Sequence, residues 1–565
     1  MNILKQTLKI VLIVTGSIAF LILMTIGVLE YYMRFPEPVQ KGDRINPASL
    51  NRMVLGENHF RVNNSWLRKN EYGIWEMYLE GAPYERGVTY GVLAKELMEN
   101  QEVAFVEQIR EMIPNEWMLR YLKYFIAWFN RDIYQYIEEE NLQEIYGISH
   151  SFSDEFSFIG ENYFRILNYH AAHDIGHALV DMNMVGCTSF AVNGPFSADS
   201  SLLIGRNFDF NMGDRFSEDK LIVFLNPDKG YKLAYYTWAG FTGVVSGINE
   251  KGLTVTLNAA KSKLPFSAKE PISLLAREIL QYCATIEEAK TLAAKRQIFV
   301  SESLLIGSAA EQSASVIEKS PEKQDVYHLK NNLLVCSNHY QSPAFENDST
   351  NIENMLQSDS KYRFDRMLEL INQKIPLNYN EAAEILRDQR GLDDQYLGMG
   401  NPKAINQLLA HHAIIFKPES REFWISTQPY QLGVFLHYDL NTVFENAALM
   451  DKITSDNFLI PEDNFLKSED YTRFEQFKIS RNALQTSLLT GKSITLSTDQ
   501  ISEFIASNPE SYITYQLLGD YFYRKQKKTE AVEYYKKALS KEVASLKERE
   551  AILKKMTSLP EALSH

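Results

Sequence analysis

A cysteine in the middle of the chain has the sequence context of a catalytic nucleophile. Cys187 follows Gly186 and opens the apolar run CTSFAV. Because glycine leaves its carbonyl carbon sterically open, the Cys187 thiolate could attack it and move the acyl group to sulfur. Hydrolysis would then make Cys187 a new N-terminal residue. A free α-amine has a pKa of roughly 7.7–8.0, close to the optimum for a general base at neutral pH. One residue could thus supply both nucleophile and base, without a catalytic histidine.

Two charged residues in the next predicted strand suit this chemistry. Arg206 and Asp209 lie 19 and 22 residues beyond Cys187. An arginine beside the thiol would favour the thiolate, and an aspartate could hold the protonated amine by a hydrogen bond. The alternative is an ion pair on the surface.

Histidines cluster before the predicted cleavage point. His170, His173 and His177 can share one face of a helix. Such a face could bind Zn²⁺, pack against a sheet or line an acyl pocket. The spacing is not H-E-x-x-H and no cysteine cluster accompanies it, so we expect no metal and no other cofactor. The pair His411–His412 is expected to be structural.

Composition bounds the class of protein. A chain of 565 residues predicts two or three folded units, and 45% hydrophobic with 23% charged residues is typical of a globular protein. A net charge of −14 without a basic block gives no electrostatic case for nucleic-acid binding. Three cysteines exclude a disulfide-stapled scaffold, although a single bridge is possible.

One stretch near the N-terminus is long and apolar enough to cross a bilayer. Ile10–Leu29 is free of charges, and about 20 such residues span ~30 Å of hydrocarbon. A cleaved signal peptide would have an apolar region of roughly 7–15 residues and a small-residue cleavage site. This run is longer and ends in Tyr31 and Tyr32, as at a membrane interface. Since Lys5 and Lys9 precede it without any acid, we expect a single-pass anchor with a cytoplasmic N-terminus and an extracytoplasmic body, periplasmic in a bacterium.

The predicted elements form helices and strands in separate blocks. Short runs rich in Val, Ile, Leu and aromatics with Gly or Asn turns predict an antiparallel sheet, interrupted by helices around 273–294 and 362–373. This arrangement predicts the α+β class. The predicted regions are a cytoplasmic N-terminus (1–9), a transmembrane anchor (10–29), a turn-rich connector (30–72), a helical segment (73–186), a strand-rich core (187–440) and a helical tail (441–565).

The tail contains the pattern of one tetratricopeptide repeat. Tyr515–Phe522 is followed by small and aromatic residues from Ala531 to Ala538 at the spacing of that helix-turn-helix unit. A solitary repeat cannot bury its apolar face. We therefore expect degenerate neighbours within 441–507 and 541–558, or packing on the body; the alternative is an ordinary helical appendage.

Several separated patches resemble known motifs. GAPYERG at 81–87 is similar to a G-x-P-x-x-x-G segment. GINEKGL at 247–253 is similar to a G-x-N-E-x-G-L hairpin, and the strand that follows it ends at Asn258. Asn338-His339 and SKYRFDR at 360–366 follow in order. Together with GCTSF and GRNFDF, these patches resemble the isopenicillin-N acyltransferase family of N-terminal nucleophile (Ntn) hydrolases, which are related to choloylglycine hydrolases. The resemblance covers 73–440; the anchor, connector and tail lie outside it.

The resemblance implies a four-layer αββα sandwich, with 73–186 as the pro-segment and 187–440 as the catalytic core. It implies self-cleavage between Gly186 and Cys187, then hydrolysis or transfer of an acyl group from a linear C–N amide, or an ester, through a thioester. Asn338 would be an oxyanion donor and Asn258 a second polar group. Arg363, or Arg366 one turn later, would join Arg206 and Asp209 in organising the thiolate and amine. The residues expected in the substrate pocket are Thr188, His170, His173, His177 and His339.

The sequence thus predicts a membrane-anchored, self-processing cysteine amidohydrolase or acyltransferase whose chains 1–186 and 187–565 stay associated. We expect an acylated, lipid-like substrate, a protein partner on the helical repeats and no nucleic acid. One alternative is an inactive body that serves as a membrane-tethered tetratricopeptide adaptor. Another is an acylase of the bile-salt or penicillin-V type, which would share the fold and differ in its substrate.

Overall fold

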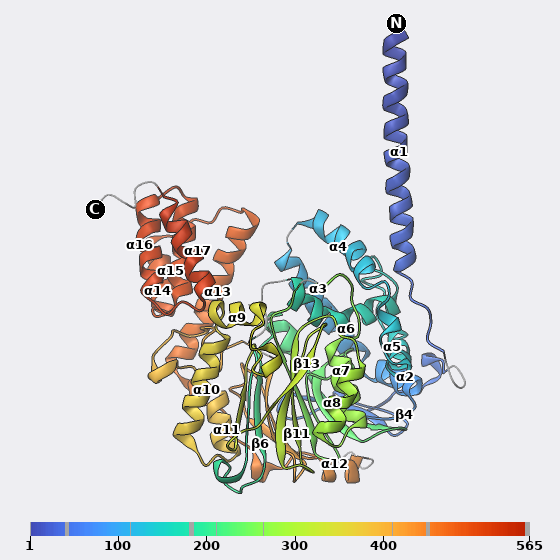
Figure 1. Cartoon of the computed structure of the whole chain (residues 1–565), viewed down its shortest axis with the longest axis vertical. Coiled ribbons are helices and arrows are strands. Elements are labelled where there is room, and N and C mark those ends of the chain that lie inside the picture. The colour runs from blue at the N-terminus through green and yellow to red at the C-terminus, as the bar shows by residue number, and fades with distance from the viewer. Residues whose placement is uncertain are drawn as a thin grey trace.

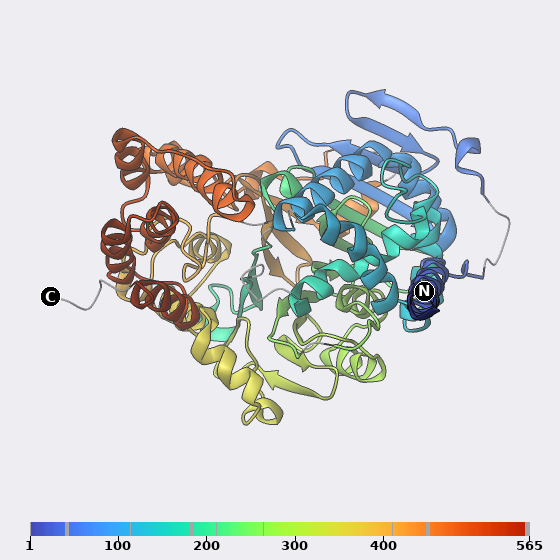
Figure 2. The same cartoon turned by 90° about the horizontal axis from the view of Figure 1, so that it is seen from above.

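The computed structural model describes residues 2–39, 45–113, 115–179, 186–210, 212–263, 265–409, 411–447 and 452–559. A layered body carries one long helix, α1 (Asn2–Tyr32), which projects away from it (Figure 1). Seen from above, α1 stands at one edge of the body and the C-terminal helices lie at the other (Figure 2).

The strands of the described residues form two sheets. In spatial order, the larger sheet contains β1 (Met53–Gly56), β2 (His59–Val62), β3 (Ser65–Lys69), β4 (Trp75–Gly81), β7 (Lys220–Pro227), β8 (Leu233–Trp238), β9 (Ser246–Asn249), β10 (Leu253–Ala259), β11 (Glu302–Ser308), β12 (Ser313–Lys319) and β13 (Gln324–His328). The smaller sheet contains β14 (Leu333–Cys336), β5 (Thr188–Val192), β6 (Leu203–Phe208), β15 (His412–Lys417), β16 (Glu422–Ser426) and β17 (Phe435–Asp439). Neighbouring strands are antiparallel, except that β4 and β7 run parallel.

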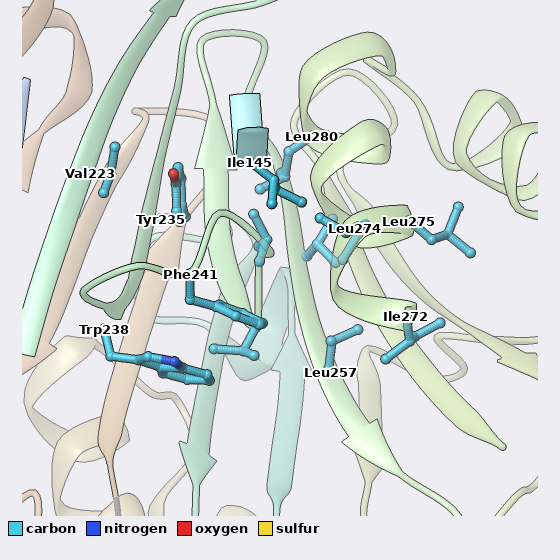
Figure 3. Packing of buried hydrophobic residues seen from close by; sticks show 14 of the residues in the cluster. Ile145, Val223, Tyr235, Trp238, Phe241, Leu257, Ile272, Leu274, Leu275 and Leu280 are labelled. Atoms are coloured by element: carbon cyan, nitrogen blue, oxygen red, sulfur yellow. The ribbon is translucent and has the colours of Figure 1, made fainter. Parts of the chain in front are cut away.

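The other described helices pack around the two sheets or form a group at the C-terminal end of the chain. Their bounds are α2 (Pro83–Leu93), α3 (Lys95–Met112), α4 (Glu116–Phe129), α5 (Glu139–Ser149), α6 (Asn162–Leu179), α7 (Ile272–Tyr282), α8 (Ile286–Lys295), α9 (Ser349–Gln357), α10 (Ser360–Lys374), α11 (Tyr379–Leu386), α12 (Leu440–Asn446), α13 (Glu469–Thr490), α14 (Thr498–Ser507), α15 (Tyr512–Arg524), α16 (Lys528–Leu539) and α17 (Leu546–Thr557). The large core on the outer face of the larger sheet takes side chains from α2, α5, α6 and α7. In Figure 3, Ile272 and Leu274 of α7 lie near Leu257 of β10 in this core.

The two sheets share a second core, and a third core joins the smaller sheet to α10 and α11. The layers therefore run helices, sheet, sheet, helices, and the predicted α+β class is confirmed. Because the central strands are buried on both faces, they are continuous apolar runs and do not alternate with polar residues; KLIVFLNP in β7 is an example.

The structure differs from the expected connector at 30–72. Strands β1, β2 and β3 extend the larger sheet, so residues from Met53 onward belong to the body. Each has only four or five residues, too few for a clear pattern. Asn63, with φ of 53°, and Asn64 form the two-residue turn between β2 and β3.

The C-terminal helices pack on the body. Phe474 of α13 and Leu518 of α15 share a core with Met399 and Leu408, which lie in the loop before β15. The side chain of Asn508 exchanges two hydrogen bonds with the backbone of Met399, at 3.1 and 2.8 Å. The C-terminal helices therefore share one apolar core with this part of the body.

Within α1, Lys9–Tyr32 is long and apolar enough to cross a membrane. A signal sequence near an N-terminus can also pass this test of length and composition. The foot of α1 contacts the body, because the hydroxyl of Tyr124 in α4 donates to Glu30 at 3.0 Å.

Candidate active site

Cys187 lies immediately before β5, the strand between β14 and β6 in the smaller sheet. Its side chain is 1% exposed, and its Sγ lies 3.6 Å from Nη2 of Arg206. Burial raises the pKa of the Cys187 thiol to about 11; Arg206 opposes this shift, whereas Asp209 adds to it. The thiol of the uncut chain therefore needs a base before it can attack.

Arg206 connects the two sheets at this point. It lies on β6, and its Nη1 donates to Ser246 Oγ of β9 at 2.8 Å, while Nη2 also donates to the carbonyl of Leu257 in β10. Burial lowers the pKa of Arg206, but the guanidinium is one of the side chains that stay charged in proteins. A fixed positive charge thus lies beside the sulfur.

Asp209 is positioned by strand register. The pairing of Thr188 with Asn207 continues past β5, and the amide of Gly186 donates to the carbonyl of Asp209 at 3.1 Å. Oδ1 of Asp209 accepts a hydrogen bond from Gln431 at 3.0 Å, but Oδ2 is buried without a partner among the residues described. Burial raises the pKa of Asp209 to about 7.

Arg363 comes from α10 and reaches the same place from the opposite side. Its Nη1 donates to the carbonyl of Cys187 at 2.9 Å and to Oγ1 of Thr188 at 2.8 Å, and its Nη2 donates to Oδ1 of Asn338 at 2.8 Å. Arg366 instead pairs with Asp388, Asp394 and Glu369, away from Cys187. The structure therefore places Arg363, and not Arg366, at the predicted nucleophile.

The two asparagines come from different sheets, Asn258 from the larger sheet and Asn338 from the end of a strand in the smaller one. Asn258 of β10 accepts from Ser189 at 2.8 Å, and its Nδ2 donates to the carbonyl of Cys336 at 3.3 Å. Nδ2 of Asn338, which follows β14, donates to the carbonyl of Ala259 at 2.8 Å. Each amide nitrogen carries two hydrogens and uses one of them in these bonds, so each can still donate to a developing oxyanion.

Gln407 has no motif that sequence reasoning could use, and yet it contacts the predicted scissile bond. Its Nε2 donates to the carbonyl oxygen of Gly186 at 3.2 Å. A Cβ at position 186 would meet that nitrogen at 2.2 Å, so the glycine allows Gln407 to approach the peptide. The same loop contacts the C-terminal helices through Met399. A donor on this oxygen would polarise the Gly186 carbonyl.

Two further groups near the site were given no role in it by sequence reasoning. His412 shares a hydrogen-bond partner with Arg206, because its Nε2 lies 2.9 Å from the Ser246 Oγ to which Arg206 donates. The pair His411–His412, which was expected to be structural, thus helps to position the arginine. Glu302 of β11 is fully buried with no hydrogen-bond partner on either oxygen in the described part of the chain. Burial raises its pKa well above the ordinary value.

The expected pocket histidines have different surroundings. His170 is buried, with Nδ1 at 2.8 Å from the carbonyl oxygen of Ile166 and Nε2 at 3.0 Å from Thr242 Oγ1. Both ring nitrogens therefore have hydrogen-bond partners within the protein. Nδ1 of His339 lies 2.8 Å from Ser360 Oγ. The side chains of His173 and His177 lie outside the described residues. Among the side chains that are described, no group of three or more His, Cys, Asp or Glu could hold a metal ion.

The three cysteines are free thiols, so the single bridge allowed by the sequence is not formed. Thr188, the other expected pocket residue, is fully buried and holds Arg363.

The described residues also enclose an apolar cavity of about 270 Å³. Phe210, which follows Asp209, lines it together with Tyr169, Ala172 and Ile175. From there it extends between α3, α4 and α6. A cavity with such a lining can bind a hydrocarbon chain.

Comparison with known proteins gives distant similarities. The family model described as acyl-coenzyme A:6-aminopenicillanic acid acyl-transferase matches residues 196–428. An uncharacterized protein of Archaeoglobus fulgidus is 23% identical over 424 residues, 68% of this chain and 68% of that protein. The N-acylethanolamine-hydrolyzing acid amidase of Caenorhabditis elegans is 24% identical over 225 residues, which span 38% of this chain and 59% of that enzyme.

Among solved structures, the Caenorhabditis elegans N-acylethanolamine-hydrolyzing acid amidase ortholog aligns with a TM-score of 0.30 at 18% identity, over 41% of this chain and 93% of that chain. A variant of the conjugated bile acid hydrolase from Clostridium perfringens aligns with a TM-score of 0.30 at 14% identity, over 45% of this chain and 93% of that chain. By sequence, the chain is similar to acyl-coenzyme A:6-aminopenicillanic acid acyl-transferase over residues 196–428, which include Arg206, Asp209, Asn258, Asn338 and Arg363 and begin just after Cys187.

Proposed function

We propose that the chain is a membrane-anchored, self-processing cysteine enzyme of the Ntn-hydrolase type that cleaves or transfers the acyl group of an amide. One arrangement around the Gly186–Cys187 peptide carries the proposal. The thiol has Arg206 beside it, the carbonyl oxygen has Gln407 as a donor, and the buried Oδ2 of Asp209 has no partner among the described residues. An ordinary buried cysteine would require none of these three features.

Self-cleavage would begin when a base takes the proton of the Cys187 thiol. Asp209, with a pKa of about 7, suits this task. The thiolate attacks the Gly186 carbonyl carbon, and Gln407 stabilises the oxyanion. The C–N bond breaks with the proton passing to the nitrogen of Cys187. Water then hydrolyses the thioester, leaving a carboxylate on Gly186 and a free amine and thiol on Cys187.

Turnover would use the new terminus. The α-amine of Cys187 takes the thiol proton, and the α-ammonium becomes a partner for Oδ2 of Asp209. The thiolate attacks the substrate carbonyl while Asn338 and Asn258 donate to the oxyanion. The ammonium protonates the leaving amine, and water or an acceptor amine then releases the acyl group from sulfur. Arg363, bonded to the carbonyl of Cys187, fixes the position of that residue.

The apolar cavity and the apolar span of α1 support a substrate with a long acyl chain. The direct test is to incubate the purified full chain with a panel of N-acyl amides and to measure fatty acid release. Release that depends on Cys187 supports the proposal. If no member of the panel is hydrolysed or transferred to an added amine by the cleaved protein, the proposal fails.

We propose in addition that Lys9–Tyr32 stays as a single-pass anchor with the N-terminus in the cytoplasm and the body outside, and that α13–α17 form a tetratricopeptide-like region that binds a protein partner. Support comes from the continuous apolar span and from the α15–α16 hairpin. Outside the cytoplasm coenzyme A thioesters are scarce, so hydrolysis of amides, or acyl exchange between amines, is favoured.

Replacing Gln407 by alanine should slow self-cleavage by about 10²–10³-fold, since that is the usual effect of losing one oxyanion donor. Turnover by molecules that have already been cleaved should change little, because Gly186 is no longer part of the reaction. Cleavage can be followed by the appearance of the two chains after cell-free synthesis. Gln341→Ala, which removes a similar bond to the carbonyl of Val335, is the matched control. Equal cleavage rates in both variants would exclude the role of Gln407.

The uncut chain should become less stable as pH rises toward 7. Folding raises the pKa of Asp209 from 3.8 to about 7, so its contribution to stability is fully present below pH 3.8 and is lost as pH rises through about 7. Between these two pH values the free energy of unfolding should fall by roughly 4 kcal/mol, at ~1.4 kcal/mol per unit of pKa shift. We expect the Tm of Cys187→Ala to fall between pH 4 and pH 8 relative to Cys187→Ala/Asp209→Asn. Parallel Tm curves would show that Asp209 has an ordinary pKa.

A further inference from the structure

Helix α4 presents a row of large apolar side chains to solvent. Trp117, Tyr121, Phe125 and Trp128 lie three or four positions apart and therefore share one face. Trp117 is 68% exposed and Trp128 is 43% exposed. The opposite face is used by the body, since Leu122 and Ile126 line the apolar cavity. A contiguous aromatic face of this kind marks an interaction surface.

The contact with α1 fixes the height of this face relative to a membrane. Tyr124 of α4 donates to Glu30, two residues before the end of the apolar span at Tyr32. Ile26 lines a surface cavity together with Trp117 and Tyr121. Ile26 precedes Tyr32 by six residues, so at 1.5 Å per residue it lies about 9 Å inside the end of the span. In Figure 1, α4 lies on the side of the body from which α1 rises.

Cations accompany the aromatic face as they do at membrane interfaces. The guanidinium of Arg131 lies 5.2 Å from the ring centroid of Trp128, and the ammonium of Lys123 lies 5.1 Å from that of Tyr124. Arg120 lies over Trp117 at 6.0 Å. Aromatic rings prefer the headgroup region, and long basic side chains extend toward phosphates.

We propose that α4 is a second membrane contact, in which the Trp117–Trp128 face lies in the headgroup region of the leaflet where α1 ends. The occupant of this face is the lipid bilayer, and the proposal rests on the proposed anchoring of α1. The apolar cavity shares Arg110, Leu119 and Phe158 with the surface cavity at Ile26. It thus opens toward the same leaflet, and an acyl chain could pass from the lipid to Phe210 without crossing water.

Tryptophan fluorescence in vesicles tests this proposal without using activity. The chain has six tryptophans. Of these, Trp66, Trp75, Trp238 and Trp424 are buried, which leaves Trp117 and Trp128 as the exposed ones. We would reconstitute the full chain into phosphatidylcholine vesicles whose acyl chains carry bromine, a short-range quencher. The wild type should lose much of its emission relative to unbrominated vesicles, and Trp117→Phe/Trp128→Phe should lose almost none.

A matched control places an equally exposed tryptophan far from α4. Phe458 is 43% exposed, like Trp128, and the segment that contains it packs on β17. Phe458→Trp added to the double variant should leave the emission insensitive to bromine. A wild type that floats with the vesicles but is not quenched, or a chain that does not float, would overturn the proposal. Quenching in a protein that hydrolyses no amide would leave this proposal standing and would contradict only the enzymatic one.

Discussion

Cys187→Ala is expected to remain a single uncut chain and to lose amide hydrolysis by on the order of 10⁴-fold or more, which is the scale expected for loss of a covalent nucleophile. The sulfur is the atom that attacks both the Gly186 carbonyl and the substrate, and the Cys187 nitrogen becomes the base. No neighbouring side chain in the described residues can replace both functions. Cleavage is measured by gel and mass, and turnover by release of fatty acid from the best N-acyl amide.

The matched control is Cys283→Ala. Cys283 is also a buried free thiol, at the end of α7, and its pKa is raised by burial, as is that of Cys187. This control should cleave and turn over as the wild type does. Full turnover by Cys187→Ala would instead favour a different nucleophile, and an unchanged biological role of Cys187→Ser with loss of a protein partner on removal of 441–565 would favour the adaptor alternative.

Arg206→Leu should give the second largest loss, about 10³-fold in kcat/KM of the cleaved enzyme. At roughly 4 Å and an effective dielectric constant of about 20, a charge pair contributes ~4 kcal/mol, or about three pH units in the pKa of the thiol. Without Arg206 the thiolate would be scarcer at neutral pH. The rate of alkylation of Cys187 by iodoacetamide as a function of pH measures this directly, and its midpoint should rise.

Arg206→Lys distinguishes charge from packing. Lysine keeps the positive charge but cannot donate to Ser246, Leu257 and the sulfur together, so an intermediate loss is expected. Arg215→Leu removes an exposed arginine that pairs with Glu107, and it should have little effect. If Arg206→Lys shows the wild-type alkylation profile and the Arg206→Leu profile does not move, then Arg206 acts only in packing.

The strands that position the site were predictable because they are buried on both faces. Every residue of TSFAV in β5 and LIGRNF in β6 is buried, and the apolar residues at the ends of β6 flank Gly205, Arg206 and Asn207. The motifs of the resemblance also located Arg206, Asp209 and Arg363, which the structure gathers around Cys187.

Other features depend on contacts that no local pattern reveals. Gln407 lies in a loop and reaches Gly186 only because residues 221 positions apart meet in the fold. Strands β1 to β3 are too short to be recognised, and they join the larger sheet through the pairing of β3 with β4. The row of aromatics on α4 was present in the sequence, but its meaning depends on α1 lying beside it.

The central claim is that the Gly186–Cys187 bond breaks and that the new N-terminus is the catalyst. Intact-mass measurement combined with N-terminal sequencing of the active, purified protein tests it most directly. We predict two associated chains, 1–186 and 187–565, the second beginning with an unmodified Cys187. A preparation that hydrolyses amides at full rate while remaining a single chain of 65.1 kDa would contradict it.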